Sequence, residues 1–290
     1  MYHKAYGIIE TQAPLHVGAS AGEESGNLNL IFRDQFTQTG IVPGSSIRGR
    51  FRADMRYADK DFANECYGHE AESGKPNSTT EALVKFEYAS LLWLPVFCPG
   101  QPVVYITCQR LLRRYYQITK KPSSQAPEQN QVELPKPNEV ELEKHRKVLF
   151  FNLGFLKNLK AVTTLSQWIP DGLDYPPTNL VVVDDKYMGI IQDMALYRQS
   201  RVHLKDKEKI VDGQGFFNVE ALPEGSILVF PIAVKPPEEE KIGWKTYLES
   251  TDWQNSSGAF SKEMYFGGLE SIGFGRCKVT LAGKYLQGEN

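Results

Sequence analysis

The stretch GSSIRGRFRADMR, residues 44–56, decides the architecture that this sequence predicts. Its apolar side chains Ile47, Phe51 and Met55 recur every four residues, which is the buried stripe of an amphipathic helix. The two serines near its start are favourable N-cap residues. The pattern therefore predicts a helix over residues 46–62 that packs one side against a core.

The same stretch carries the strongest functional signal in the chain. Residues 44–57 hold four arginines and one aspartate, a local charge of +3 in a chain whose formal net charge is −2. Three of the arginines are spaced four residues apart on one helical face, and a helix N-terminus adds free N–H groups and partial positive charge. This combination predicts a phosphate site; the alternative is an ordinary solvated basic face. The residues assigned to phosphate binding are Ser45, Ser46, Arg48, Arg50, Arg52 and Arg56.

Two more segments are locally basic. Residues 109–121 contain five basic side chains and no acidic one, interleaved with Tyr115 and Tyr116, and this composition suits stacking on unpaired bases. Residues 198–209 contain five basic and two acidic residues. The alternative for both segments is that the basic side chains pair with nearby acids. The RNA contacts predicted here are Arg113, Arg114 and Arg201.

A glycine-rich segment, FGGLESIGFGR, spans residues 266–276. Glycine lacks a Cβ atom, so these positions let the backbone approach a ligand closely, and the arginine adds a fork that binds phosphate. The contacts predicted in this segment are Gly267, Gly268, Gly273 and Arg276.

The composition excludes several classes of protein. The 290 residues are 41% hydrophobic and 23% charged, as in ordinary globular proteins, and no run of 18 apolar residues predicts a membrane span. The four cysteines form no CxxC pair and the first residues lack the apolar stretch of a signal peptide, so a cytoplasmic location is expected. Phosphate-loop, zinc-protease and serine-hydrolase motifs are missing. Cys66 and His69 make only half a zinc site, so no metal site is predicted.

Short apolar runs bounded by turn residues predict a chain rich in strands. The expected strands cover residues 5–15, 28–32, 82–96, 103–107, 148–151, 179–183, 227–234 and 277–281, with a second helix over 108–116. Residues 122–147 contain four prolines, which predicts an exposed insertion or mobile loop outside the core. The charged stretch over residues 201–225, which includes KDKEK at 205–209, predicts a β-hairpin that projects into solvent.

Five segments, in this order, resemble the RAMP-superfamily backbone subunits of type III CRISPR effector complexes, and are most similar to those of the Cmr type (III-B). The resemblance leaves residues 117–165 and 235–258 unmatched. The segments are PLHVGAS (14–20), NLIFRDQFTQTGIVPGSSIRGRFR (29–52), ASLLWLPVFCPGQPVVYITCQRLLRR (89–114), GQGFFNVEALPEGSI (213–227) and FGGLESIGFGRCKV (266–279).

The resemblance implies an α+β fold with a modified ferredoxin-like (RRM-like) core in a single domain over residues 1–290. It also implies an insertion over residues 117–165, with a mobile proline-rich loop, and a projecting thumb β-hairpin over residues 198–218. The implied partners are CRISPR RNA, target RNA, other effector subunits and further copies of the chain that stack along the guide, with no membrane. In the family a PGSSxKGxxR block grips the guide's phosphates, and its basic positions here are Arg48 and Arg52.

The positions that the family uses for cleavage are only partly kept. Members that cut target RNA carry an aspartate five residues before an arginine that is Arg33 here, and this position is Leu28. Leucine neither binds a metal ion nor transfers a proton. An acid and a tyrosine of the family are replaced by Val219 and Asn218.

The catalytic candidates that remain are His16 and Glu220, which match the family, and Asp34. Asp34, Glu23 and Glu24 are acids close to the position of the missing aspartate, and any one of them could replace it. We therefore expect a subunit that binds CRISPR RNA without cutting and needs no cofactor. One alternative is an endoribonuclease that cuts target RNA with Mg²⁺. Two others are a metal-independent RNA-processing enzyme with His16 as its base and a globular protein without an RNA role.

Overall fold

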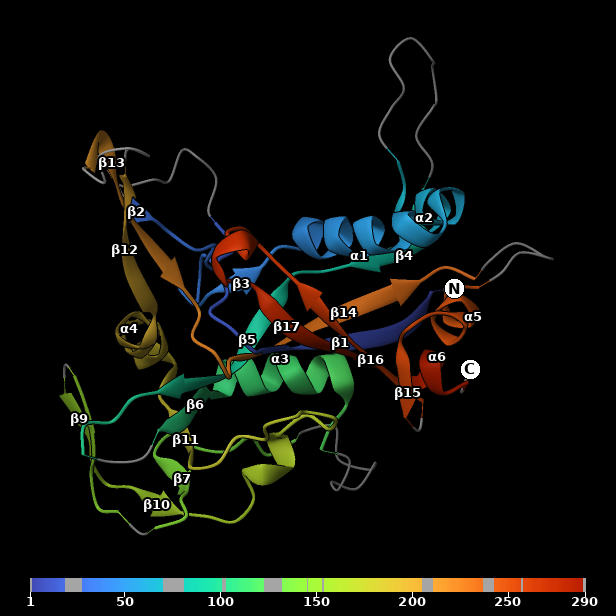
Figure 1. Ribbon diagram of the computed structural model, residues 1–290. Helices are drawn as coiled ribbons and strands as arrows, with labels where there is room; N and C mark the ends of the chain where they lie inside the picture. The colour runs from blue at the N-terminus through green and yellow to red at the C-terminus, as the bar shows by residue number, and fades with distance from the viewer. Residues whose placement is uncertain are drawn as a thin grey trace.

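One large mixed sheet forms the centre of the molecule, and helices cover both of its faces (Figure 1). The computed structural model describes residues 2–18, 28–69, 81–100, 103–122, 132–144, 146–152, 154–204, 211–236, 243–256 and 258–288. Within these ranges the large sheet has twelve strands. They are β1 (His3–Thr11), β3 (Ile41–Val42), β4 (Val84–Phe86), β5 (Ala89–Val96), β6 (Val104–Cys108), β7 (Glu139–Glu141), β10 (Lys160–Ala161), β11 (Leu180–Val183), β14 (Ile227–Val234), β15 (Gln254–Ser256), β16 (Ala259–Tyr265) and β17 (Arg276–Ala282).

Strand β1 lies inside the sheet and pairs antiparallel with β14 on one side and β17 on the other. The order across the sheet is β10, β7, β11, β6, β5, β14, β1, β17, β16, β15, while β3 pairs with β5 and β4 with β14. The strands predicted at residues 5–15, 179–183, 227–234 and 277–281 correspond to β1, β11, β14 and β17. The fold is thus of the predicted α+β class.

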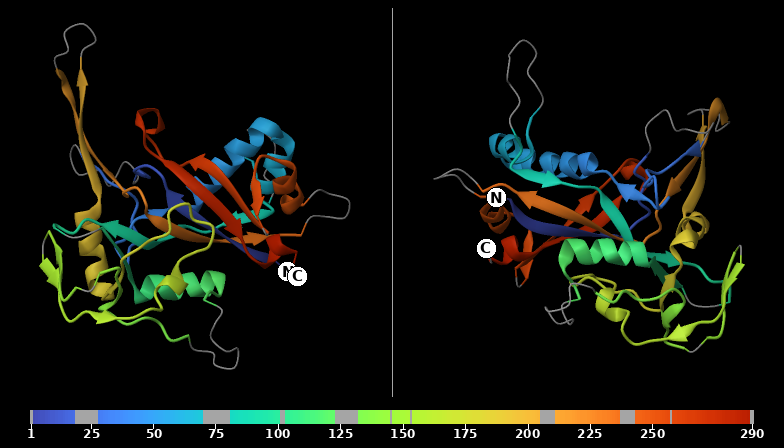
Figure 2. Two further views of the ribbon diagram at one scale, coloured as in Figure 1. Left: turned by 60° about the horizontal axis from the view of Figure 1, so that its bottom comes forward. Right: turned by 180° about the vertical axis from the view of Figure 1, so that it is seen from behind.

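Two smaller sheets stand beside the large one. Strands β12 (Tyr197–Leu204) and β13 (Val211–Ala221) pair antiparallel, and β13 also pairs with β2 (Leu28–Asn29). The left view of Figure 2 shows β12 and β13 extending away from the large sheet, in the range where the sequence predicts a hairpin. Strands β8 (Leu149–Phe151) and β9 (Gly154–Leu156) form a separate two-stranded hairpin.

Helices α1 and α3 cover opposite faces of the large sheet (Figures 1 and 2). The side chains Ile47, Phe51 and Met55 of α1 are buried, as their spacing predicts. Under α3, the Trp93 indole nitrogen donates a hydrogen bond of 3.1 Å to the Trp168 carbonyl inside a second apolar cluster. The helices are α1 (Gly44–Ala58), α2 (Lys60–Tyr67), α3 (Gln109–Thr119), α4 (Asp185–Ala195), α5 (Trp244–Ser250) and α6 (Lys284–Gln287), with 3-10 turns at Ser166–Trp168 and Glu270–Ile272.

The single helix predicted over residues 46–62 is wrong at both ends. The first helix ends at Ala58 because Asp59 is extended, and the Asp59 carboxylate accepts a hydrogen bond of 2.9 Å from the Phe62 N–H, which starts α2. At the other end the N-cap is Pro43, with no side-chain cap, so the two serines lie inside the first turn.

The prediction that residues 122–147 stay outside the core is wrong for their second half. Strand β7 pairs with β11 and β10, and Val140 is 3% exposed. A three-residue strand needs only one inward side chain, and pairing satisfies its backbone, so a proline-rich composition around it does not exclude it. Residues 123–131, to which the predicted mobile loop extends, are outside the described ranges.

None of the described helices is long and apolar enough to cross a membrane. The four cysteines, Cys66, Cys98, Cys108 and Cys277, are buried and form no disulfide. The Cys66 thiol therefore fills space in the core, which is the common role of a buried cysteine.

Candidate nucleic-acid interface

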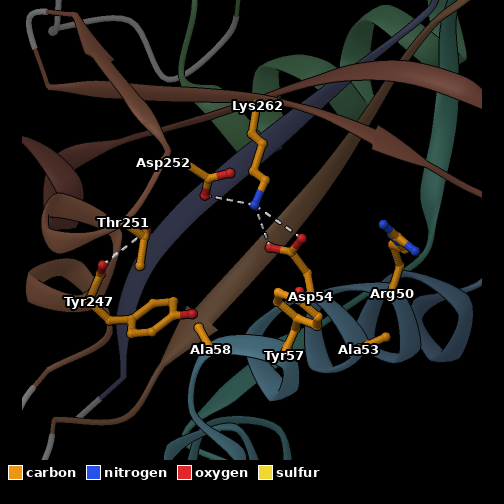
Figure 3. Close-up of a pocket in the computed structure, with 9 residues that line it drawn as sticks. All are labelled: Arg50, Ala53, Asp54, Tyr57, Ala58, Tyr247, Thr251, Asp252 and Lys262. Carbon is orange, nitrogen blue, oxygen red and sulfur yellow. Dashed lines mark hydrogen bonds and ion pairs between the residues drawn. The ribbon is translucent and has the colours of Figure 1, made fainter.

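A groove runs along one side of α1. Near the start of the helix, a hollow of about 430 Å³ is lined by Ser46 and Arg50 on α1 and by Gly267 and Gly268. An adjoining hollow of about 630 Å³, also lined by Arg50, continues along the helix (Figure 3). We call the two together the α1 groove. The fold thus brings two segments predicted to bind RNA, more than 200 residues apart, to one surface.

The α1 groove is lined by charges of both signs: Arg50 and Lys262 are basic, and Asp54, Asp252 and Glu270 are acidic, while Arg48 is exposed on α1 outside the lining. The first turn of α1 holds no acidic residue. Within the described part of the chain, neither Arg48, which is exposed, nor Arg50 forms an ion pair, and the buried Arg50 Nε has no hydrogen-bond partner. A helix N-terminus with two unpaired guanidinium groups is suited to bind an anion.

The other two arginines of α1 are directed to α2. The Arg52 guanidinium donates to the Gly68 carbonyl at 3.4 Å, and that of Arg56 donates to the Asn64 side chain at 3.2 Å. The prediction placed both on a phosphate-binding face. The structure brings them to the side that packs on α2, whereas Arg50, about half a turn away, lines the groove.

Lys262 carries a second positive charge into the α1 groove, but two carboxylates bind it. Its ammonium donates to Asp54 and to Asp252, each at 2.8 Å (Figure 3). Burial alone lowers the pKa of Lys262, and the hydrogen bonds to both aspartates outweigh burial and raise it. Lys262 therefore stays charged and neutralises Asp54, the acid of α1 that lies four residues after Arg50.

The glycines of the 266–276 segment serve the chain's own packing. Gly267 has φ +79°, and a Cβ atom there would lie 2.0 Å from the His16 carbonyl oxygen. The Gly268 N–H donates to that same oxygen at 3.0 Å. Gly273 has φ +91° with open space around it. The backbone that closely approaches Gly267 is that of the His16 loop, and contact of Gly267 with RNA stays a prediction.

Two further predicted contacts lie elsewhere. Arg276 is paired with the Glu263 carboxylate at 3.8 Å and donates to the Gln12 carbonyl at 3.3 Å, outside the α1 groove. Arg201 lies in β12, where its backbone pairs with that of Phe217, and its side chain is outside the described part of the structure.

The basic residues of α3 are on the face of the sheet opposite α1 (Figure 1). Arg114 is fully engaged: its guanidinium donates to the Ser90 hydroxyl at 2.9 Å, lies 4.2 Å from the Tyr88 ring centre and pairs with Glu87 at 3.6 Å. Intramolecular pairing is therefore the correct interpretation for Arg114. Arg113 is exposed at a separate hollow.

Glu220 is the centre of an ion cluster at the base of the β12–β13 pair. Its carboxylate is 3% exposed and accepts from Arg33 at 3.1 Å and from Arg198 at 3.0 Å. Arg33 also pairs with Asp193 of α4. Burial alone lowers the pKa of Arg33, and its bonds to Asp193 and Glu220 outweigh this and raise it. We call these four residues the Glu220 cluster.

His16 contacts the backbone of Glu220 rather than its carboxylate. The ring nitrogen Nδ1 lies 2.6 Å from the Glu220 carbonyl oxygen, which can only accept, so Nδ1 carries the proton. In the neutral ring Nε2 is then unprotonated. It faces Gly18, where a Cβ atom would lie 3.1 Å from it. His16 is 7% exposed.

The acids proposed for cleavage are engaged in the fold. Asp34 accepts from the backbone N–H of Thr37 at 2.7 Å and of Phe36 at 3.1 Å, and although burial raises its pKa, these bonds outweigh burial and lower it. Among the described residues no group of three histidine, cysteine or acidic side chains could hold a metal ion. Both Glu220 oxygens accept from arginines, so the described residues do not fit a Mg²⁺ site.

Of the family's other cleavage positions, Val219 is buried and the Asn218 side chain accepts from the Ser200 hydroxyl at 2.6 Å. The backbone of Leu28 pairs with that of Asn218, and its side chain is outside the described part of the structure. Glu23 and Glu24 also lie outside it.

Sequence reasoning missed the roles of Asp193 and Arg198. They meet Arg33 and Glu220 only because α4 and β12 cross the end of the Arg33 loop, and the Arg33–Glu220 pair spans 187 residues. No pattern among neighbouring residues predicts such a contact. The one available signal was the alternation of β12 and β13, which places Arg198 opposite Glu220.

A comparison with protein-family models matches residues 8–278 to the RAMP superfamily. The chain belongs to the RAMP superfamily. A comparison with curated protein sequences gives no match.

Several solved structures are similar to this RAMP protein over nearly its whole length. A chain of the type III-B Cmr-beta cryo-EM structure in the apo state has 20% identity and a TM-score of 0.68, and the match covers 95% of this chain and 96% of that one. A chain of Cmr-beta bound to cognate target RNA has 19% identity and a TM-score of 0.69, with 96% and 97% covered. Oligomeric Cmr4 from Pyrococcus furiosus has 16% identity and a TM-score of 0.61, with 96% and 98% covered. These likenesses confirm the predicted fold.

Proposed function

We propose that this RAMP protein is a backbone subunit of a type III-B CRISPR effector complex, which binds the phosphates of CRISPR RNA without cutting the target. The observation that carries the proposal is the N-terminal half of α1, where Arg50 in the α1 groove and the exposed Arg48 beside it form no ion pair with any described residue. A guide has no fixed sequence, so its carrier needs contacts to phosphates, which do not depend on the base.

The contacts around the candidate acids support binding without cleavage. Cleavage assisted by a metal needs an anionic oxygen free to bind the ion near the scissile phosphate. Glu220 accepts from two arginines, and Asp34 holds the turn at Thr37 and Phe36. Leucine at position 28 supplies no oxygen. The Nε2 atom of His16 faces Gly18, but the main contacts of His16 fix its loop to Glu220 and Gly268.

The similar structures support the proposed partners. One is described as Cmr-beta bound to cognate target RNA and another as oligomeric Cmr4. We infer that the present chain assembles with target RNA, other effector subunits and further copies of itself. If copies of the chain stack along a guide as a filament, the number bound should increase with the length of the guide. The sedimentation coefficient of the protein with guides of about 20, 40 and 60 nucleotides tests this. A fixed stoichiometry would contradict it.

The decisive experiment combines the protein with a guide, labelled complementary RNA and Mg²⁺, and resolves the products on a gel. We expect a stable complex with the guide and intact target. Cleavage that disappears in the Glu220→Gln variant would instead establish the endoribonuclease. Failure of the wild-type protein to bind guide RNA at low salt would contradict the RNA-binding function altogether.

A further inference from the structure

The β8–β9 hairpin presents two exposed aromatic side chains. Its strands alternate, so Leu149 and Phe151 are buried at 1% and 9% exposure while Phe150 of β8 points outward with 50% of its surface exposed. Phe150 pairs directly across the hairpin with Phe155 of β9, which is 55% exposed. The buried residues anchor the hairpin to the core, and the outer face holds the two rings at fixed positions.

The two rings form one small platform. Their centres lie 6.3 Å apart at an interplanar angle of 61°, and the Lys157 ammonium lies 4.3 Å from the centre of the Phe155 ring. A pair of rings held by strand register loses little conformational freedom when a planar ligand stacks on it. A cation over the ring adds an attraction for an anion close to the same surface.

The segment that carries this platform is basic, although Glu139, Glu141 and Glu143 precede it in the sequence. Residues 144–160 contain five lysines and arginines and no aspartate or glutamate. Lys160 pairs with Glu139 at 3.2 Å. The exposed ammonium groups of Lys144, Lys147 and Lys157 form no ion pair with any residue that the structure describes. A local excess of positive charge therefore surrounds the exposed rings.

We propose that the β8–β9 hairpin is a second RNA contact, in which an unpaired base stacks on one of the rings of Phe150 and Phe155 and meets the other at its edge, while the neighbouring lysines contact the flanking phosphates. The inference rests on the proposed RNA-binding function and adds a site separate from the α1 groove. Figures 1 and 2 place β9 and α1 on different sides of the molecule. Single-stranded RNA combines a flat base with adjacent negative charge, which is the chemistry that this surface complements.

A nucleic acid fits this surface better than a protein does. The central parts of protein interfaces are depleted in lysine, and two half-exposed rings form a small apolar area. Phe97 is also an exposed aromatic residue, but its surroundings differ from those of Phe150 and Phe155. It is 65% exposed but lines a hollow together with Glu10, Asp174 and Glu224, whose charges repel RNA.

The test measures the affinity of the purified protein for a fluorescein-labelled 40-nucleotide RNA by anisotropy at several salt concentrations. For the Phe150→Ser/Phe155→Ser variant we expect binding at least tenfold weaker, with an unchanged slope of log K against log salt because no charge is removed. The Phe97→Ser variant is the control and should bind like the wild type. A Phe150→Trp variant should retain binding, since a larger ring still stacks.

A second readout locates the contact directly. RNA containing 5-iodouridine, photo-crosslinked to the wild-type protein, should label a peptide that includes Phe150 or Phe155. Normal RNA affinity of the double serine variant, with melting unchanged, would overturn the inference. The same result together with loss of the variant from assembled effector complexes would assign the hairpin to a protein partner. Failure of the wild-type protein itself to bind RNA would count against the proposed function instead.

Discussion

Helix α1 and the Glu220 cluster are both rich in arginine, and both were predicted to take part in RNA chemistry, but their charges are used in opposite ways. In the cluster, Arg33 and Arg198 share the buried carboxylate of Glu220. On α1, Arg50 in the groove and the exposed Arg48 have no carboxylate partner among the described residues. The difference teaches that the availability of a charge, rather than its presence, identifies a candidate binding surface.

A single lysine accounts for much of this difference. Asp54 lies one helical turn after Arg50 and is the acid best placed to pair with it. Lys262, which reaches α1 from β16, donates to both Asp54 oxygens and to Asp252. The sheet thereby neutralises the acid of α1 and leaves Arg50 available.

The largest expected effect concerns the Glu220 cluster. Glu220→Ala removes the buried partner of two guanidinium groups and should lower the free energy of unfolding by about 3 kcal/mol, the lower end for breaking a buried pair, because Arg198 is half exposed. Urea unfolding measures this loss. The Glu220→Gln variant should lose less stability, because the amide oxygen still accepts a hydrogen bond from an arginine. An unchanged stability in both variants would contradict the structural role of the cluster.

The next largest effect concerns the α1 groove. Arg48→Glu with Arg50→Glu should weaken binding of unrelated RNA sequences about 30-fold and flatten the slope of log K against log salt, because fewer counterions are released. Filter binding at three salt concentrations measures both. Arg56→Glu makes the same charge change as Arg50→Glu alone, but on the side of α1 that contacts Asn64, so the comparison of these two single variants is the control. Equal weakening by the two single variants would show that RNA contacts the other side of α1.

Replacing Lys262, which lies between the two aspartates, should allow a carboxylate to pair with the arginine of the α1 groove, as Glu220 pairs with arginines in its cluster. In Lys262→Met the Asp54 carboxylate becomes free to pair with Arg50, so RNA affinity should fall about fivefold. Adding Asp54→Asn should restore affinity in filter binding, which completes a double-mutant cycle. If the double variant stays as weak as Lys262→Met, the charge of Lys262 itself contacts RNA and the explanation above is wrong.

The smallest effect concerns Asp34. The experiment distinguishes a structural role of this acid from a catalytic one. Its pKa is lowered in the folded protein, so its ionised form stabilises the fold above the usual carboxyl pKa of about 3.9, and this stabilisation is lost as the pH falls through the lowered value. Asp34→Asn should therefore be less stable than the wild type at pH 7, with the difference shrinking between about pH 5 and pH 3. Thermal melts at four pH values measure it. A constant difference would contradict the role of the ionised side chain.

Local sequence predicted those parts of the fold that depend on neighbouring residues. The stripe of Ile47, Phe51 and Met55 predicted α1, and the apolar run at 227–234 predicted β14. The end of α1 was missed because helix propensity continues through Asp59, and only its capping bond to Phe62 marks the break. Strand β7 was missed because the partner that stabilises it, β11, lies about 40 residues later.

The site was predictable only in its residue types. Arg50 and Arg114 look alike in sequence, since each lies on an amphipathic helix among other basic residues. Arg114 is bound by Ser90 and Tyr88, 24 and 26 residues away, whereas Arg50 meets no such partner. Contacts between strands and helices distant in sequence determine which arginine is available, and a charge count contains no information on them.

The position of β1 has a consequence for how the chain folds during synthesis. His3 pairs with Val234 and Thr11 with Cys277, so β1 leaves the ribosome more than 200 residues before either strand that pairs with it. The backbone groups of β1 remain unpaired, and its apolar side chains remain exposed, until most of the protein has been synthesised. Such non-local pairing slows folding and leaves strand edges open to aggregation in the meantime. Production of this protein should therefore be sensitive to the supply of chaperones that bind nascent chains.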